Sequence, residues 1–304
     1  MKDYYIWSEH NLQEELAKVT PGEDIRIYAA EEQQISDDFD YSVLEKCNSV
    51  EFLFGAVSHP GYVEAAKIGD LNLWWNFWLF KAFESMAYTQ KSRSDHSKLF
   101  ISLNSRPHEH RCILMDELHR TNLANHGILS WHELDVSHYD WKYWTPRQLT
   151  LKDDFSINFF QHILPPEYDD AVINLVSEST TQGIFITEKT WHAILAAKPF
   201  VVVGGKGFHD FLQKAGFELY NELFNYEFDG ISNDTRRIKA VCKNLERLSN
   251  HDYTKLYKSV EDKCFRNQRK AFDMIRNQKD VPQMALESNY YCTILEEAKC
   301  KLGT

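Results

Sequence analysis

Residues 171–205 read AVINLVSESTTQGIFITEKTWHAILAAKPFVVVGG, and this stretch decides the fold class. It opens with a nearly continuous apolar run, which is typical of a parallel strand buried on both faces. The middle part, TEKTWHAILAAK, spaces Trp191, Ile194 and Leu195 for burial on one side of a helix. The stretch ends in a second apolar run, PFVVVGG. Strand, helix and strand in this order predict a βαβ unit, and therefore an α/β protein.

A second unit of the same kind precedes it. Residues 98–104 (KLFISLN) and 127–131 (GILSW) read as strands, and residues 106–123 between them read as a helix with Pro107 in its first turn. Near the start of the chain, strands are predicted at residues 3–7, 24–30 and 50–57, with a helix at 10–19. Both regions of the chain therefore alternate strands and helices.

The polar stretch TQKSRSDHSK at residues 89–98 is a candidate domain boundary. We expect an α/β domain at residues 1–97 and a Rossmann-like domain at 98–280, which becomes helical from about residue 232. Residues 281–304 are expected to form a C-terminal helix that packs back on the first domain. The sequence thus predicts two units and a helical tail.

Two segments of the chain are rich in aromatic residues. Residues 71–83 (LNLWWNFWLFKAF) are predicted to form a core helix, since a membrane-spanning helix needs about 20 apolar residues. We therefore expect no membrane span. Residues 133–170 are compatible with a lid, an acceptor-binding loop or ordinary packing.

Charge is unevenly distributed over the 304 residues, whose formal net charge is −11. Residues 1–97 hold 17 acidic and 8 basic side chains, whereas residues 236–280 hold 13 basic and 6 acidic ones. Such asymmetry indicates either an anionic partner or a solvated helix face. The six cysteines form no CxxC pair and the start of the chain has no leader pattern, so we expect reduced thiols and a cytoplasmic location.

The turn Thr187-Glu188-Lys189 has the chemistry of an anion site. The free N–H groups at the start of a helix favour an anion, Thr187 is the expected N-cap, and Lys189 adds a full positive charge. Glu188 is better suited to accept hydrogen bonds from ribose hydroxyls. Arg106 opens the other predicted helix, so the two cations suit a diphosphate. The alternative is a well-capped helix with no ligand.

This segment resembles the signature that binds the nucleotide-sugar in the alpha-1,3-fucosyltransferase-like glycosyltransferases. The matching features are Glu178-Ser179, Phe185, Thr187-Glu188-Lys189 and the apolar strand from Pro199 to Gly204. The block ISLNSRPHEHR at residues 101–111 is similar to a segment of uncharacterised phage and viral glycosyltransferase-like proteins. Two departures stand out. The family usually has Tyr where this chain has Phe185 and places Asn before its Ser, so the nucleotide-sugar need not be GDP-fucose.

The resemblance implies a GT-B architecture, with two Rossmann-like domains facing a cleft and a helical C-terminal region. It implies a UDP- or GDP-linked sugar as substrate, no metal and no other cofactor. By this likeness Arg106 and Lys189 contact the diphosphate, Glu188 contacts the ribose, and Phe185 and Glu178 line the pocket. The nucleotide-sugar-binding set is completed by Asn104, Ser179, Thr187 and Gly204.

A glycosyl transfer also needs a general base. The candidates follow predicted strands: His59 in SHPGY is favoured, with Glu9 and His10 as alternatives. Neither the Asp38-Phe39-Asp40 motif nor the pair His108 and His110 has a convincing metal-ligand pattern.

The expected activity is transfer of a sugar from a nucleoside diphosphate to an acceptor hydroxyl. Two acceptors stay open: a glycan or lipid-linked saccharide, or a hydroxymethylated pyrimidine in phage DNA, which would place the protein in the bacterial host cytoplasm. The alternative from a different class is a catalytically inactive protein that binds a nucleotide or a sugar phosphate.

Overall fold

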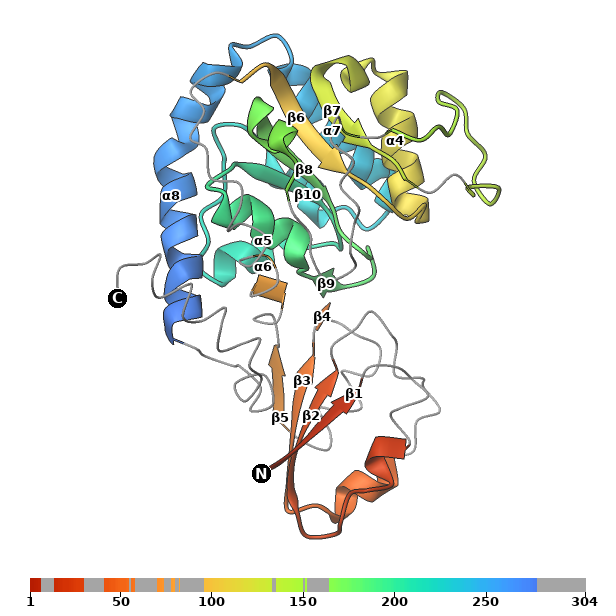
Figure 1. The fold of residues 1–304 in the computed structure, drawn as a ribbon, viewed down its shortest axis with the longest axis vertical. Helices are drawn as coiled ribbons and strands as arrows, with labels where there is room; N and C mark the ends of the chain where they lie inside the picture. The colour runs from red at the N-terminus through yellow and green to blue at the C-terminus, as the bar shows by residue number, and fades with distance from the viewer. Residues whose placement is uncertain are drawn as a thin grey trace.

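The computed structural model describes residues 1–6, 14–29, 41–54, 56–57, 70–73, 78–79, 82, 96–132, 135–149, 151 and 164–277. Within these residues the chain forms two four-stranded parallel sheets and one short antiparallel pair, so the α/β prediction is confirmed (Figure 1). The strands are β1 (Lys2–Ile6), β2 (Asp24–Ala29), β3 (Ser49–Phe54), β4 (Ala56–Val57), β5 (Asp70–Leu73), β6 (Lys98–Leu103), β7 (Gly127–Ser130), β8 (Ala171–Ser177), β9 (Ile184–Phe185) and β10 (Phe200–Val203). The α-helices are α4 (Glu109–Arg120), α5 (Glu188–Leu195), α6 (Phe208–Lys214), α7 (Asp234–Leu248) and α8 (Tyr253–Asn277). Short 3-10 helices are η1 (Tyr41–Lys46), η2 (Leu123–His126), η3 (Pro166–Asp170) and η4 (Tyr226–Gly230).

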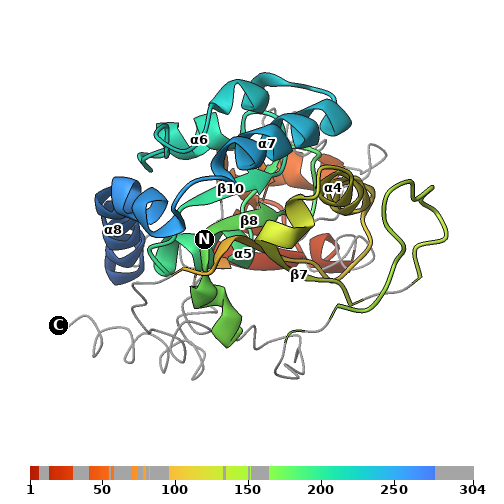
Figure 2. The same ribbon diagram turned by 90° about the horizontal axis from the view of Figure 1, so that it is seen from above.

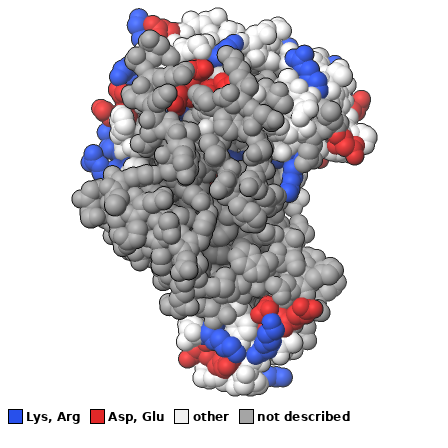
Figure 3. Space-filling model, in the orientation of Figure 1, with Lys and Arg blue, Asp and Glu red and all other residues white. Residues whose placement is uncertain are grey.

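The first sheet has the strand order β1-β2-β3-β5, and every neighbouring pair is parallel. The predicted strands at 3–7, 24–30 and 50–57 correspond to β1, β2 and β3 with β4. The prediction of one helix over residues 71–83 is wrong at its start, because residues 70–73 pair with β3 as strand β5. Figure 3 shows cationic and anionic side chains next to each other at this end of the molecule, where Arg26 pairs with Glu51 at 2.5 Å.

The second sheet has the strand order β10-β8-β6-β7 and is parallel throughout. All seven residues of β8 and all four of β10 are buried, as the continuous apolar runs predict. Helices cover both faces: α4 packs on α7, and α5 packs on α8. Figure 2 shows α7 and α5 on opposite sides of the β8–β10 pair. This is the layering of a doubly wound sheet.

The order of connections locates a topological switch point. Strand β6 leads through α4 to β7 on one side, whereas β8 leads through α5 to β10 on the other side. Strands β6 and β8 are themselves neighbours, with Ile101 opposite Asn174. The two connections therefore diverge between β6 and β8, which is where open parallel sheets bind ligands beyond their carboxyl ends.

Strands β4 and β9 connect the two sheets. Ala56 pairs with Phe185 and Val57 with Ile184, in antiparallel register. Strand β4 follows β3 after a single residue, and β9 lies in the loop between β8 and α5 (Figure 1). The edge of the first sheet where β3 ends is thus joined to the loop that follows β8.

The described part of the 133–170 segment contributes to packing. Trp141 and Trp144 stand edge-on to the fully buried Trp131, with ring centroids 5.7 and 5.4 Å away, and His119 of α4 stacks on Trp144 at 5.3 Å. Of the three interpretations of this segment, ordinary packing is the one that residues 135–149 fit.

The remaining predictions concern cysteines and membranes. The described cysteines are free thiols, three of them buried: Cys47, Cys112, Cys242 and Cys264. In the described residues, no helix combines the length and apolar character needed to cross a bilayer. Residues 281–304, predicted to form a helix, lie outside the described part of the chain.

Candidate functional site

Two loops meet at the switch point. Residues 104–108 follow β6 and lead into α4, whereas residues 178–187 follow β8 and lead into α5. Because β6 and β8 are parallel neighbours, both loops leave the same edge of the sheet. This edge collects every described residue that the sequence placed in a nucleotide-sugar site.

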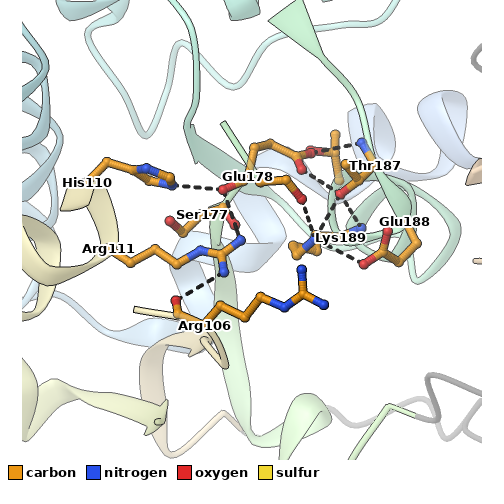
Figure 4. Close-up of polar contacts among 10 residues, drawn as sticks. Arg106, His110, Arg111, Ser177, Glu178, Thr187, Glu188 and Lys189 are labelled. Atoms are coloured by element: carbon orange, nitrogen blue, oxygen red, sulfur yellow. Dashed lines mark hydrogen bonds and ion pairs between the residues drawn. The ribbon is translucent and has the colours of Figure 1, made fainter. Parts of the chain in front are cut away.

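The Lys189 ammonium lies at the N-terminal end of α5. Its Nζ donates to Ser179 Oγ and Thr187 Oγ1, each at 3.2 Å, and to Glu188 Oε1 at 3.0 Å (Figure 4). Thr187 is the N-cap, as predicted, and its hydroxyl accepts from the Lys189 amide at 3.4 Å. The Lys189 side chain is 28% exposed, so its charge is held in place and still faces solvent.

Glu188 contacts Lys189 and is only 7% exposed. The ion pair reduces the net positive charge at this end of α5.

Glu178 is fully buried and holds the start of α5. One carboxylate oxygen accepts from the Thr187 amide at 3.2 Å and from the Thr190 hydroxyl, and the other accepts from the Thr187 hydroxyl. Burial raises the pKa of this carboxyl group, against the opposing effect of Lys189. The carboxylate therefore positions Thr187 from below the surface; it does not form an exposed pocket wall.

Arg106 is exposed on the loop after β6, and Figure 4 shows its side chain extending toward Lys189. Arg111, in the first turn of α4, is buried instead, and its guanidinium donates to backbone carbonyl oxygens (Figure 4). It donates to Arg106 O at 3.2 Å, to Glu178 O at 3.0 Å and to Ser177 O at 3.5 Å. Arg111 thus ties the loop after β6 to the end of β8.

His110 joins Arg111 on the Glu178 carbonyl, at 2.8 Å from its Nε2. Since a carbonyl oxygen only accepts, Nε2 must carry the proton of the neutral ring. Burial, reinforced by the charge of Arg111, lowers the pKa of His110 to about 4. The imidazole is therefore neutral at pH 7.

Gly204 and Gly205 close the site on the β10 side. The carbonyl of Gly204 accepts from the buried Arg237 guanidinium at 2.8 and 3.1 Å. A Cβ at Gly205 would lie 1.8 Å from the carbonyl oxygen of Gly183. The backbone at Gly205 therefore approaches the 178–187 loop too closely for a side chain.

Two further predicted residues are buried. Asn104 is 2% exposed, and its side-chain amide donates to Ser102 Oγ at 3.0 Å. Phe185 is 1% exposed in β9 and stands edge-on to Trp78 at 6.0 Å. Neither side chain forms an open surface.

The three base candidates, Glu9, His10 and His59, lie outside the described residues, as do Asp38 and Asp40. Sequence reasoning missed Arg111 and Arg237. Arg111 had no usable signal, since its acceptors Ser177 and Glu178 are 66 and 67 residues away. Arg237 had none, since its partner Gly204 is 33 residues away.

The site combines three cations, Arg106, Arg111 and Lys189, with two carboxylates, Glu178 and Glu188. Two helix N-termini, those of α4 and α5, point at the same edge of the sheet. This arrangement suits a ligand with a compact negative charge and neighbouring hydroxyls. Comparison of the chain with protein-family models, curated proteins and solved structures found no match.

Proposed function

We propose that this protein is a glycosyltransferase that moves a sugar from a UDP- or GDP-linked substrate to an acceptor hydroxyl. The observation that carries the proposal is the placement of Lys189 and Arg106 at two helix N-termini on either side of the β6–β8 switch point. Cations and helix N-termini are what a departing diphosphate requires. In this role the acceptor oxygen attacks the anomeric carbon, the bond to the β-phosphate breaks, and a base takes the acceptor proton.

The β4–β9 pair supports a GT-B arrangement with units at residues 1–97 and 98–280. It brings β4, which directly follows β3 of the first sheet, against the loop that carries Ser179 and Thr187. His59 follows Val57 of β4 by two residues in the chain, which makes it the first choice as base, ahead of Glu9 and His10. We extend the proposal to a C-terminal helix at 281–304 that packs on the first unit.

The charge on the exposed face of α7 helps to choose between the two acceptor classes. Arg236, Lys239 and Lys243 are exposed and lie within about 60° of arc on the helix. At the N-terminal end of the same helix, Asp234 accepts from Thr181 of the 178–187 loop. The cationic face therefore begins beside the candidate site, and this position favours a nucleic-acid acceptor over a saccharide.

Salt dependence separates the two acceptor classes. If the three cations neutralise three phosphates, duplex affinity falls about 40-fold between 50 and 200 mM salt. Replacing Arg236, Lys239 and Lys243 by Glu should remove this dependence. Transfer to oligosaccharides at a rate that salt does not change would instead assign the saccharide class.

The proposed activity is tested by incubating the protein with a panel of nucleotide-sugars and measuring release of the nucleoside diphosphate. We expect release with one member of the panel and loss of release in Lys189→Ala. Tight nucleotide binding with neither transfer nor hydrolysis would favour the inactive binding protein.

A further inference from the structure

Two buried oxygens at the switch point lack hydrogen-bond partners. Asn104 Oδ1 and Ser177 Oγ are both shielded from solvent, their residues are each 2% exposed, and neither atom has a partner in the part of the chain that the structure describes. Native proteins pair nearly all such groups, so each exception needs an explanation.

The two oxygens belong to neighbouring positions. Ile101 of β6 lies opposite Asn174 of β8, and continuing this register by three residues places Asn104 beside Ser177. Ser177 is the last residue of β8 and Asn104 is the first residue after β6, and the connections diverge between these two strands. The pair therefore lies where a doubly wound sheet receives its ligand.

The chemistry of the pair selects one kind of ligand group. The Asn104 amide nitrogen already donates to Ser102, so Oδ1 needs a donor. The Ser177 hydroxyl can donate or accept. A phosphate oxygen has no proton for Asn104, whereas a sugar hydroxyl donates to Asn104 and accepts from Ser177 at the same time.

We propose that Asn104 and Ser177 form a subsite that binds one sugar hydroxyl of the nucleotide-sugar, an inference that rests on the proposed function. Lys189 and Arg106 bind the diphosphate, and this pair reads the adjacent sugar. Because neither oxygen is accessible to solvent, the hydroxyl reaches them only when the residues that cover the pair move outward.

Ser177→Ala is the sharpest test, because removing an unpaired hydroxyl breaks no bond in the free protein. Binding of UDP, GDP, UDP-glucose and GDP-mannose is measured by calorimetry, beside the thermal midpoint of the free protein. We expect the midpoint to stay unchanged and the affinity to fall about 5- to 10-fold, the value of one hydrogen bond. Ser249→Ala, at the C-terminal end of α7, is the matched control and should bind as the unmodified protein does.

The pattern of loss identifies the hydroxyl. An equal loss for nucleoside diphosphate and nucleotide-sugar assigns the ribose, and a loss for the nucleotide-sugar alone assigns the transferred sugar; both support the subsite. Unchanged affinity in Ser177→Ala and Asn104→Ala, with affinity lost in Lys189→Ala, would overturn the subsite and leave the nucleotide site standing. If the unmodified protein binds none of the four compounds, the proposed function and the subsite fail together.

Discussion

Replacing Glu178 by alanine should destabilise the protein by about 3 to 4 kcal/mol. The substitution leaves three buried donors without their acceptor: the Thr187 amide, the Thr187 hydroxyl and the Thr190 hydroxyl. Each lost acceptor costs about 1 to 3 kcal/mol, and relief of the buried carboxylate's desolvation offsets part of the sum. Glu178→Gln keeps the shape and one acceptor oxygen, so it should cost only about 1 kcal/mol.

Urea unfolding followed by circular dichroism measures both values, with the exposed Glu227→Ala as a control expected within about 0.5 kcal/mol of the unmodified protein. The pH dependence gives a second check. Burial raises the pKa of Glu178 in the folded state. The contribution of Glu178 to the free energy of unfolding is therefore full below its pKa in the unfolded chain, and it falls as the pH rises through its pKa in the folded protein. The penalty of the Gln variant should thus be larger at pH 4 than at pH 8. Three equal unfolding energies for the unmodified, Ala and Gln proteins would refute the buried network.

Other consequences concern stability and loop geometry. The pKa of His110 falls to about 4 in the folded protein, so acidification from pH 6.5 to 4 should lower the free energy of unfolding by about 3 kcal/mol. Urea unfolding at several pH values should show a smaller decrease in His110→Asn. An unchanged decrease in this variant would contradict the assignment. Burial lowers the pKa of Lys198 to about 8, so the free energy of unfolding should rise between pH 8 and 10.5. Lys198→Met should abolish this rise. If the rise persists in the variant, Lys198 is not its source. Gly205→Ala should lower the free energy of unfolding by about 1 to 3 kcal/mol and weaken nucleotide binding, because its Cβ meets the Gly183 backbone. Gly230→Ala is the control, since a Cβ there meets nothing within 4 Å. Equal effects of the two substitutions would refute the close approach at Gly205.

The second sheet was predictable because its strands are continuous apolar runs. All seven residues of β8 are buried, as a continuous apolar run predicts for a strand covered on both faces. Thr187 as N-cap was predictable for a similar reason, since the capping bond joins residues two positions apart. The edge of the sheet at which the loops meet then followed from parallel topology alone.

Long-range pairing explains what the sequence did not reveal. Residues 71–73 open the aromatic run that is predicted as one helix, and their pairing with the neighbouring β3 makes them a strand. The charge of Arg111 looks like that of any exposed helix residue, whereas its acceptors lie 66 and 67 residues further along the chain. Burial of Glu178 is likewise a property of the assembled loop and not of its local sequence.

The first measurement to make is thermal unfolding in the presence of UDP, GDP, ADP, CMP or dTDP, repeated on Lys189→Ala. A nucleotide at 100 times its dissociation constant adds about 2.7 kcal/mol to the free energy of unfolding. The switch-point site predicts a higher unfolding temperature with one nucleotide and no change in the variant. Identical unfolding temperatures with and without every nucleotide would mean that Thr187, Glu188 and Lys189 only cap a helix, and would contradict the glycosyltransferase proposal.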